Sequence, residues 1–384
     1  MMNRIYLDHA ATTPVSGTVL AAMLPFFSAS PGNASAIYGT GRDARKAVEN
    51  ARRQVAAAIG AETRDILFTS GGSESDNLAV KGTAYALKDS GKHIITTAIE
   101  HPAVMNACTW LEKQGFDVTY IPPDTEGRIY PETVRQAIRE DTILISVMAA
   151  NNEIGTIEPV AEIGRIASET GIVFHVDAVQ AAGAVPIDVN AWRADLLSLS
   201  AHKVCGPKGV GALYIRRGIR IDPLIHGGEQ ERGLRAGTEN TAGIVGMGQA
   251  FKEATEKLTV NSERTKYLRD CLINGILSTV PGTSLNGPKK GRLPNNCNLC
   301  FEKIDGEALL LRMDLAGIAG SSGSACTAGS QKSSHVLKAI GLSDEQAKGS
   351  LRLTVGPENT EAEVDETIHT IAGIIADLRT MYRT

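Results

Sequence analysis

The chain has 384 residues, of which 42% are hydrophobic and 21% are charged, a balance typical of a globular protein with a substantial core. Its formal net charge of -4 at pH 7 gives no basic footprint, so direct binding to nucleic acid is not expected. No apolar run is long enough to span a bilayer and the N-terminus lacks a signal-peptide core, which predicts a cytoplasmic protein that does not bind membranes.

The first part of the chain alternates short apolar runs with segments of helical spacing. The runs predict strands over 66–69, 93–97, 143–147, 172–176 and 196–199, and the spacing predicts a helix over 160–170. Runs that are apolar throughout are typical of strands buried on both faces, as in a mostly parallel sheet with helices on either side. The fold class is therefore α/β, with an α/β/α arrangement.

From about residue 251 the pattern changes. A helical stretch rich in Lys and Glu leads to a Gly/Pro/Lys segment, a predicted strand over 298–301, a helix over 306–314, a loop of small residues and a last strand over 350–354. This mixture predicts a smaller α+β domain. We expect a large domain over 15–255 and a small domain made of 1–14 and 256–384.

Ligands of parallel α/β sheets bind beyond the carboxyl ends of the strands, so the residues that follow each predicted strand are candidates for a site. Glycines and small hydroxyls over 70–75 follow the first strand, which suits a phosphate but also fits an ordinary strand–turn–helix. His101 follows the second strand and Asn152 the third, and each also fits a helix entry or a turn.

Asp177 and Lys203 follow the next two predicted strands. A carboxylate at the end of an apolar strand needs a donor or a positive charge, so Asp177 suits a helix N-cap or a protonated pyridine nitrogen. A desolvated lysine favours the neutral amine that forms a Schiff base, although most lysines are solvated surface groups. Together, a phosphate cradle, a histidine, an aspartate and this lysine indicate a pyridoxal 5'-phosphate site.

The order of the motifs resembles the cysteine desulfurases, which belong to the class V group of fold-type I pyridoxal-phosphate enzymes. The resemblance runs from about Tyr6 to Pro357 and implies a fold-type I transferase with a large α/β/α domain and a smaller α+β domain. The motifs are LDHAATTP at 7–14, GSES at 72–75, EHP at 100–102, NNEIG at 151–155, HVDAVQ at 175–180, SAHK at 200–203, RAGT at 235–238 and SAC at 324–326.

The resemblance implies a role for each matching residue. Lys203 would bind the cofactor covalently and move protons, and His101 would stack on its ring and assist acid–base steps. Asp177 would pair with the pyridine nitrogen and Gln180 would lie near the phenolic oxygen. The implied phosphate ligands are Gly72, Ser73, Ser200, His202 and, from a second subunit, Thr238.

The resemblance also implies a substrate and a partner. Asn152, beside the cofactor, and Arg352 would receive the carboxylate of L-cysteine, a task that suits a planar guanidinium. Because Thr238 would reach over from a second subunit, a homodimer is expected. The sulfur would pass to acceptor proteins, either an iron–sulfur scaffold or a tRNA-thiolation enzyme, and the sequence does not choose between them.

Cys326 lies in a run of small residues over 320–330. A flexible linker with an incidental thiol is one interpretation. The other is that an exposed thiolate in a mobile loop attacks the substrate and then carries the product outward. We favour the second, mainly through the resemblance, and predict that Cys326 takes the sulfur of L-cysteine as a persulfide while L-alanine is released.

The remaining cysteines have no predicted catalytic role. Cys297 and Cys300 lie three apart on a predicted strand and so face opposite sides, and no metal site is expected. Cys108 and Cys271 fall in helical patterns and are expected to pack. Cys205 departs from the larger or aromatic residue expected two positions after the lysine, and Tyr38 stands where a His is common in relatives.

Two rival interpretations remain open. A related class V enzyme, such as a selenocysteine lyase or a transaminase, is distinguished by whether alanine forms from cysteine without an added keto acid. A non-catalytic sulfur carrier on the same fold would never take up the cofactor, and the presence of Lys203 and His101 argues against it.

Overall fold

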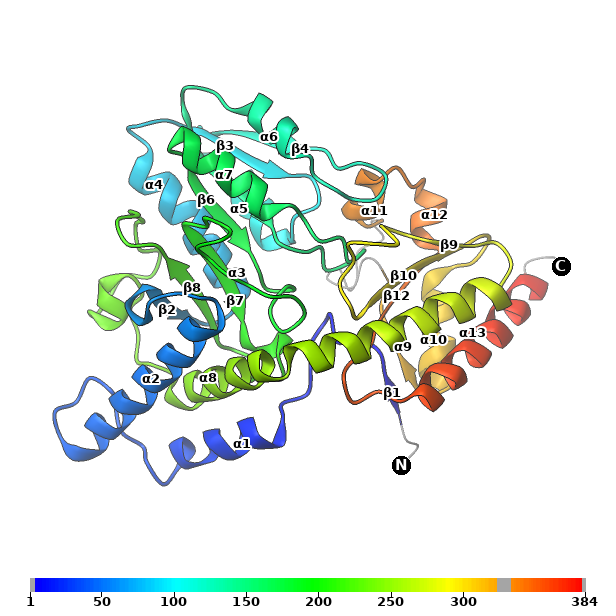
Figure 1. The fold of residues 1–384 in the computed structure, drawn as a ribbon, viewed down its shortest axis with the longest axis horizontal. Coiled ribbons are helices and arrows are strands. Elements are labelled where there is room, and N and C mark those ends of the chain that lie inside the picture. Colours follow the sequence, from blue (N-terminus) through cyan, green and yellow to red (C-terminus); the bar gives the residue numbers. More distant parts are fainter. Residues whose placement is uncertain (1–3, 323–332, 382–384) are drawn as a thin grey trace.

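The apolar runs of the first part form a seven-stranded sheet in the computed structural model, which describes residues 4–322 and 333–381 (Figure 1). The strand order is β2-β8-β7-β6-β5-β3-β4, and the neighbouring strands run parallel except that β8 is antiparallel to β2 and β7. This confirms the predicted mostly parallel sheet. The strands are β2 (Ile66–Thr69), β3 (His93–Thr97), β4 (Asp117–Ile121), β5 (Thr142–Met148), β6 (Val173–Asp177), β7 (Leu196–Ser200) and β8 (Gly211–Ile215).

Helices cover both faces of this sheet. They are α1 (Gly17–Met23), α2 (Gly39–Ala58), α3 (Gly72–Asn77), α4 (Thr83–Leu87), α5 (Pro102–Glu112), α6 (Pro131–Ala137), α7 (Val160–Thr170) and α8 (Thr241–Glu256), with the π-helical segment η3 (Leu78–Gly82) and the short turns η1 (Leu24–Phe27), η2 (Thr63–Asp65), η4 (Ala201–Lys203) and η5 (Gln230–Gly233). Ile94 and Leu144 pack in one cluster with α5, whereas Ile95 and Ile145, the next residues, pack in another with α2, α7 and α8. Successive residues of a strand point to opposite faces, which gives the three layers.

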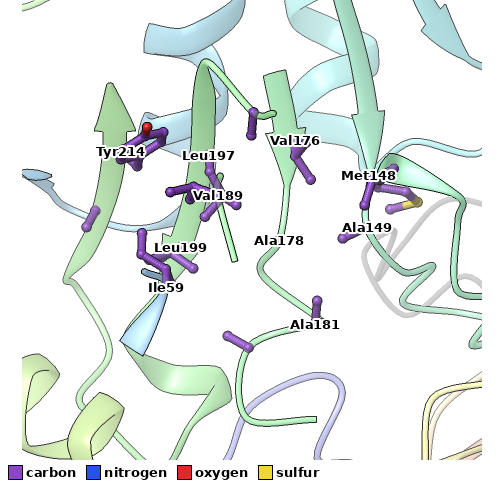
Figure 2. Close-up of a cluster of buried hydrophobic side chains, with 14 of the residues drawn as sticks. Ile59, Met148, Ala149, Val176, Ala178, Ala181, Val189, Leu197, Leu199 and Tyr214 are labelled. Atoms are coloured by element: carbon purple, nitrogen blue, oxygen red, sulfur yellow. The ribbon is translucent and has the colours of Figure 1, made fainter. Parts of the chain in front are cut away.

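The larger cluster lies directly beneath the strand ends where a site is expected. Figure 2 shows Leu197 and Leu199 of β7 beside Val176 of β6 in this cluster. All three side chains are fully buried, and burying each one stabilises the fold by about 1.5–3 kcal/mol relative to leaving it exposed. The ends of β6 and β7 are therefore rigidly held.

A second, smaller α+β body follows. Within the described residues its sheet has the antiparallel order β12-β10-β9, formed by β9 (Thr283–Leu285), β10 (Asn296–Phe301) and β12 (Ser350–Thr354). The helices α9 (Leu258–Thr279), α10 (Gly306–Leu315) and α13 (Glu361–Met381) pack around it, and α9 and α13 lie side by side in Figure 1. Their apolar residues share one core with β10 and β12.

The N-terminal segment belongs to this second body. β1 (Ile5–Tyr6) pairs in parallel with β11 (Ile318–Ala319), and Ile5 and Leu7 belong to the second core. In contrast, α11 (His335–Ala339) places Val336 and Leu337, and α12 (Asp344–Lys348) places Ala347, in the core of the large sheet. The division into a large domain over 15–255 and a small domain of 1–14 and 256–384 stays a prediction.

The predicted elements differ from the observed ones mainly at their ends. The helix over 160–170 and the strand over 350–354 end where expected. β5 is one residue longer at each end than predicted, and β6 is shifted by one residue, so that Asp177 ends the strand instead of following it. In the described part of the chain, no helix is both long and apolar enough to cross a membrane.

Candidate active site

A cavity of about 280 Å³ lies at the carboxyl ends of the large sheet. Its wall contains residues that follow β2, β3, β5, β6 and β7, as the parallel sheet predicts, together with residues of the N-terminal segment and of β12. The sequence-predicted residues that line it are Gly72, Ser73, His101, Asn152, Asp177, Gln180, Ser200, His202, Lys203 and Arg352.

Gly72 begins a continuous helical run over 72–87, made of α3, η3 and α4. A Cβ atom at this position would lie 2.9 Å from a methyl carbon of Val179, so the tight approach of helix and β6 loop requires glycine there. The first backbone N–H groups of a helix have no partner within it. This end of the cavity is therefore suited to an anion.

Lys203 ends the short turn that follows β7. Its Nζ donates hydrogen bonds to the backbone oxygens of Ala10 and Ala11, the latter at 2.8 Å, and the Gln180 amide donates to Ala10 as well. The N-terminal segment thus holds the amine at the cavity. Sequence reasoning noticed the motif at 7–14 without finding this role.

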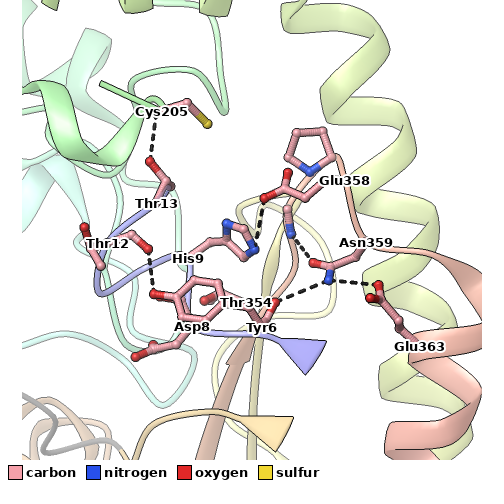
Figure 3. Close-up of polar contacts among 12 residues, drawn as sticks. Tyr6, Asp8, His9, Thr12, Thr13, Cys205, Thr354, Glu358, Asn359 and Glu363 are labelled. Atoms are coloured by element: carbon pink, nitrogen blue, oxygen red, sulfur yellow. Dashed lines mark hydrogen bonds and ion pairs between the residues drawn. The ribbon is translucent and has the colours of Figure 1, made fainter. Parts of the chain in front are cut away.

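Hydrogen bonds fix that N-terminal segment between the two bodies (Figure 3). Tyr6 donates to the backbone oxygen of Thr12 at 2.8 Å, and the hydroxyl of Thr13 accepts from the backbone N–H of Cys205 at 2.8 Å. The backbone N–H of Thr13 also donates to the oxygen of His202 at 2.9 Å. The position of Lys203 therefore depends on residues almost two hundred positions away.

The two histidines at the cavity are neutral at neutral pH. Burial, with a smaller effect from Lys203, lowers the pKa of His101 to about 4, and the same two causes lower the pKa of His202 to about 4. His101 caps α5 through Nδ1, which accepts from the N–H of Ala103 at 3.2 Å. Its Nε2 then carries the proton, and the flat neutral ring is free to stack on an aromatic ligand.

Two aspartates share the floor of the cavity, one predicted and one missed. Asp177 accepts from the backbone N–H of Val179 at 2.9 Å, and burial raises its pKa to about 6. Asp76 lies on α3, is 1% exposed, and its Oδ1 has no hydrogen-bond partner among the described residues. A signal for Asp76 was present, because residues three apart on a helix share a face and Ser73 was already predicted to be at the site.

Arg352 comes from β12 of the small sheet and is almost completely buried. One guanidinium nitrogen donates to the backbone oxygen of Asn152 at 3.0 Å and the other to the carboxylate of Asp8 at 3.0 Å. In the described structure its Nε has no hydrogen-bond partner. Because a buried donor without a partner is costly, this nitrogen indicates a place for a ligand carboxylate. Asp8 was not predicted.

Two predicted residues are not part of this cavity wall. Thr238 is exposed on the loop after η5, as a residue that acts in another subunit would be, but one chain does not test that role. The turn η5 that precedes this loop is tightly held, because Arg52 donates two 2.7 Å bonds to Glu231, and Glu231 and Arg232 both have left-handed backbone angles (φ 45° and 61°). Cys326 lies outside the described residues.

The described chain stops and resumes close to the cavity on either side of Cys326. Before the gap, Ser321 and Arg352 exchange two backbone hydrogen bonds, of 3.0 and 2.6 Å. After it, Ser334 donates to the carboxylate of Glu153 at 2.5 Å and the ring of His335 is bonded to the backbone oxygen of Glu100 at 2.9 Å. Both ends of the segment are therefore anchored to residues at or beside the cavity wall.

The remaining singled-out residues lie elsewhere. Cys205 has a left-handed backbone (φ 59°) and lines a second cavity of about 410 Å³ on the other side of Lys203. Tyr38 is exposed at the start of α2. Cys297 and Cys300 are buried on β10, and no group of three or more metal-ligating side chains occurs among the described residues.

The site as a whole fits pyridoxal phosphate. It combines an anion-binding helix start, a neutral imidazole for the ring, an amine at Lys203, and carboxylates where a pyridine nitrogen could be received. Two of its buried polar atoms, Oδ1 of Asp76 and Nε of Arg352, have no protein partner in the described structure and face the same cavity region. These unpaired atoms are expected where a polar ligand completes the site.

Comparison with known proteins gives a consistent result. The sequence model of the family described as Aminotransferase class-V matches residues 5–367. A protein of Methanosarcina thermophila named "Cysteine desulfurase IscS" is 54% identical over 377 residues, which cover 98% of this chain and 93% of that protein. The solved structure titled "NIFS-LIKE PROTEIN" is similar with a TM-score of 0.92 and 39% identity, covering 97% of this chain and 99% of that one.

A further solved structure is titled "SspA in complex with cysteine". It is similar with a TM-score of 0.83 and 40% identity, and the match covers 93% of this chain and 100% of that chain.

Proposed function

Because the chain belongs to the aminotransferase class-V family, we propose that it is a pyridoxal-phosphate-dependent cysteine desulfurase, which converts L-cysteine to L-alanine and transfers the sulfur to its own Cys326. The observation that carries the proposal is the single cavity in which a lysine, a neutral histidine, a buried aspartate and a buried arginine converge. The relative named as a desulfurase covers almost the whole chain, which supports the same reaction.

The cofactor is held by residues of the large sheet. Gly72, Ser73, Ser200 and His202 would bind its phosphate, His101 would stack on the ring, Asp177 would pair with the ring nitrogen and Gln180 would bind on the side of the phenolic oxygen. Pyridoxal phosphate, when bound, supplies the electron sink that makes the α-proton of an amino acid removable. These assignments rest on the cavity wall and on the matching motifs.

Substrate is oriented from the other side of the cavity. Arg352 receives the carboxylate of L-cysteine, with Asn152 beside it, because the guanidinium has a buried Nε without a partner in the described structure. Asp8 and the backbone of Asn152 hold the other two guanidinium nitrogens, so little rotational freedom is lost on binding.

Lys203 and His101 move the protons. Once Lys203 no longer holds the cofactor covalently, its Nζ takes the α-proton of L-cysteine. The backbone oxygens of Ala10 and Ala11 keep the amine at the cavity. His101 is neutral at physiological pH because burial lowers its pKa to about 4, so it stacks as an uncharged ring and adds no charge to the site. General acid–base steps of this kind accelerate reactions by roughly 10²- to 10⁴-fold.

Sulfur transfer takes place at Cys326. Its thiolate attacks the sulfur of the bound cysteine, the carbon–sulfur bond breaks, and the carbon fragment takes up protons and leaves as L-alanine. One thiol and one cysteine thereby become one persulfide and one alanine, with no outside oxidant. The described residues on either side of Cys326, Ser321 and Ser334, are hydrogen-bonded to residues at or beside the cavity wall, which supports this assignment.

The assembly and the sulfur acceptors are further parts of the proposal. We propose a homodimer in which Thr238 reaches the phosphate of the other subunit, a cytoplasmic address, and the predicted division into domains. The persulfide is delivered to an iron–sulfur scaffold or to a tRNA-thiolation enzyme, and both remain candidates.

The decisive experiment measures products. Purified protein loaded with pyridoxal phosphate and given L-cysteine and a thiol reductant, without any keto acid, should form equal amounts of alanine and of sulfide, which the reductant releases from the persulfide. Cys326→Ser should keep the cofactor absorbance and lose sulfide release, and Cys271→Ser is the matched control, because Cys271 lies on α9 away from the cavity. Alanine formation that depends on a keto acid would instead indicate a transaminase, and an active Cys326→Ser would exclude Cys326 as the acceptor.

A further inference from the structure

The small antiparallel sheet has one apolar and one polar face. Successive residues of a strand point to opposite faces, and apolar and polar residues alternate along β10 and β12. The apolar ones belong to the second core and are Cys297, Leu299, Leu351 and Leu353. The polar ones share the other face, are at most 3% exposed, and are Asn296, Asn298, Ser350, Arg352 and Thr354. Buried polar groups need hydrogen-bonding partners, so what covers this face is informative.

The large body covers part of the polar face with the turn over 151–155, which comes after β5. The side-chain amides of Asn296 and Asn298 each donate a 3.0 Å hydrogen bond to the backbone oxygen of Glu153. Because a carbonyl oxygen can only accept, this contact fixes the orientation of both amides. The amide oxygen of Asn298 accepts from the side chain of Asn286 at 2.8 Å. Both ends of the Asn298 amide are therefore used.

The residue beside Asn298 on this face is Arg352. The two are direct register partners across β10 and β12, so their side chains are neighbours. Arg352 donates to the backbone oxygen of Asn152 at 3.0 Å, and Asn298 donates to the next carbonyl along the chain, that of Glu153. Consecutive carbonyls of one turn are thus held by adjacent side chains of one sheet.

The turn itself is well defined. The side-chain oxygen of Asn151 accepts from the backbone N–H groups of Glu153 at 2.9 Å and Ile154 at 3.0 Å. Gly155 has a left-handed backbone (φ 78°), and a Cβ atom there would lie 2.7 Å from the side-chain amide carbon of Asn296. The turn and β10 therefore approach each other too closely for any side chain at position 155.

This contact joins the two halves of the candidate active site. Asn152 and Arg352 both line the cavity, as does Lys203 on the large body. A ligand that contacts Lys203 and Arg352 together requires a fixed distance between the large and the small body. The hydrogen bond from Asn298 to the turn sets that distance directly beside Arg352.

We propose that Asn298 is a positioning residue for substrate binding: by holding the carbonyl of Glu153, it fixes the turn over 151–155 and thereby places Arg352 at the correct distance from the cofactor side of the cavity. The inference rests on the proposed function for the identity of the substrate. The contact between Asn298 and the turn concerns the protein alone.

The first test compares a ligand that has a carboxylate with one that lacks it. In the full-length protein loaded with pyridoxal phosphate, the change in cofactor absorbance measures the binding of L-alanine, the proposed product, and of ethylamine, the same amine without the carboxylate. Asn298→Ala should weaken L-alanine binding by roughly threefold to tenfold, the loss expected for one hydrogen bond, and leave ethylamine binding unchanged. Asn298→Asp should weaken L-alanine binding by roughly tenfold to a hundredfold, because it places an acceptor against the Glu153 oxygen and a negative charge beside Arg352.

Ser350→Ala is the matched control. Ser350 is a fully buried residue of β12 whose hydroxyl donates to the backbone oxygen of Ala347 at 2.7 Å, so the variant loses a comparable hydrogen bond in the same sheet, but one to α12 instead of to the turn. Both ligands should bind to it as to the wild type. Wild-type L-alanine affinity in Asn298→Ala, an equal loss for ethylamine, or the same loss in Ser350→Ala would overturn the proposal.

A double variant separates positioning from general damage to the sheet. Asn298→Ala and Arg352→Lys should together weaken L-alanine binding by less than the product of their separate factors, because both act on the same carboxylate contact. Fully multiplicative losses would show that Asn298 does not act through Arg352.

The second test needs neither cofactor nor substrate. In the cofactor-free protein, the backbone N–H groups of residues 151–155 should exchange with solvent faster in Asn298→Ala than in the wild type or in Ser350→Ala, because the turn has lost a hydrogen bond to β10. Unchanged exchange would overturn the proposal. If the wild-type protein does not respond to L-alanine or forms no alanine from cysteine, the proposed function has failed, whereas the exchange rates still decide whether Asn298 holds the turn.

Discussion

The two sides of the cavity are built by different means. One side consists of residues at the ends of parallel strands, such as Lys203 and Asp177, whose backbones are fixed by the strands and the core beneath them. The other side contains Arg352, which is held by the backbone oxygen of Asn152 and by the carboxylate of Asp8, a residue 344 positions away in the sequence. We assign cofactor binding to the first side and substrate binding to the second. Substitutions on the two sides should therefore affect different quantities, cofactor binding on the first and KM for cysteine on the second.

The largest effect is expected on the strand-end side, from Lys203→Ala. Alanine formation should fall by roughly 10²- to 10⁴-fold because the proposed acid–base group is lost, and the absorbance of the covalently bound cofactor should disappear. The two readouts are product analysis and a visible spectrum. Lys113→Ala, an exposed lysine at the end of α5, is the control and should behave as wild type. A persisting covalent-cofactor band in Lys203→Ala would contradict the assignment.

A smaller effect of a different kind is expected on the opposite side, from Arg352→Lys. The charge remains but the planar fork is lost, so kcat/KM for cysteine should fall by roughly tenfold to a hundredfold, mainly through KM. Cofactor absorbance should not change, in contrast to Lys203→Ala. Arg312→Lys on α10, away from the cavity, is the matched control. Loss of cofactor in Arg352→Lys would show that the two sides do not function separately.

Asp8→Asn should have a weaker effect in the same direction. The amide oxygen of the new side chain can still accept a hydrogen bond from the Arg352 guanidinium, but this acceptor is neutral. Losing the charge weakens the bond by about 1 kcal/mol, so KM should rise by roughly fivefold. Because Asp8 acts through Arg352, the effects of Asp8→Asn and Arg352→Lys should not add in the double variant. Fully additive KM changes would mean that Asp8 acts independently of Arg352.

The last prediction concerns a different quantity, the free energy of unfolding and its dependence on pH, and a buried carboxyl that does not line the cavity. Burial raises the pKa of Glu158, after β5, to about 8, so the folded protein binds a proton there that the unfolded chain, with an ordinary carboxyl, releases at lower pH. This contribution is present at low pH and is lost as pH rises toward 8, by at most about 1.4 kcal/mol per pH unit. Glu158→Gln should therefore raise the melting temperature at pH 8.5 and change it little at pH 5. An equal effect at both pH values would contradict the assignment, and Glu162→Gln on the exposed face of α7 is the control.

The strand-end side could be predicted from the sequence because each of its predicted residues follows closely after an apolar run. Apolar runs such as 196–199 indicate strands, and parallel strands bring the following residues together, so His101, Asp177 and Lys203 were expected at one place and are found there. Asp76 was missed because it lies one helical turn beyond the loop that drew attention. Asp76 lies three residues after Ser73, so the two share one face of the helix, and this spacing could have predicted that Asp76 is at the site.

The other side could be predicted only in part. Arg352 was expected through the family resemblance, but its contact with Asp8 depends on how β12 and the N-terminal segment return to the same place, which no spacing in the sequence reveals. The pairing of β1 with β11 was likewise not predicted, because two-residue strands have no periodicity to detect. Cys326 lies outside the described residues, and the role of Thr238 involves a second chain, so both stay predictions.

The turn at Glu231 and Arg232 has a consequence for assembly. Left-handed backbone at a residue other than glycine costs on the order of 1–3 kcal/mol, and here the two 2.7 Å bonds from Arg52 hold the turn within a single chain. The turn that precedes the loop carrying Thr238 is thus shaped before a second subunit arrives. In the homodimer that we propose, docking then avoids the backbone ordering penalty of about 1–2 kcal/mol per residue, and association is expected to proceed with little folding at the contact.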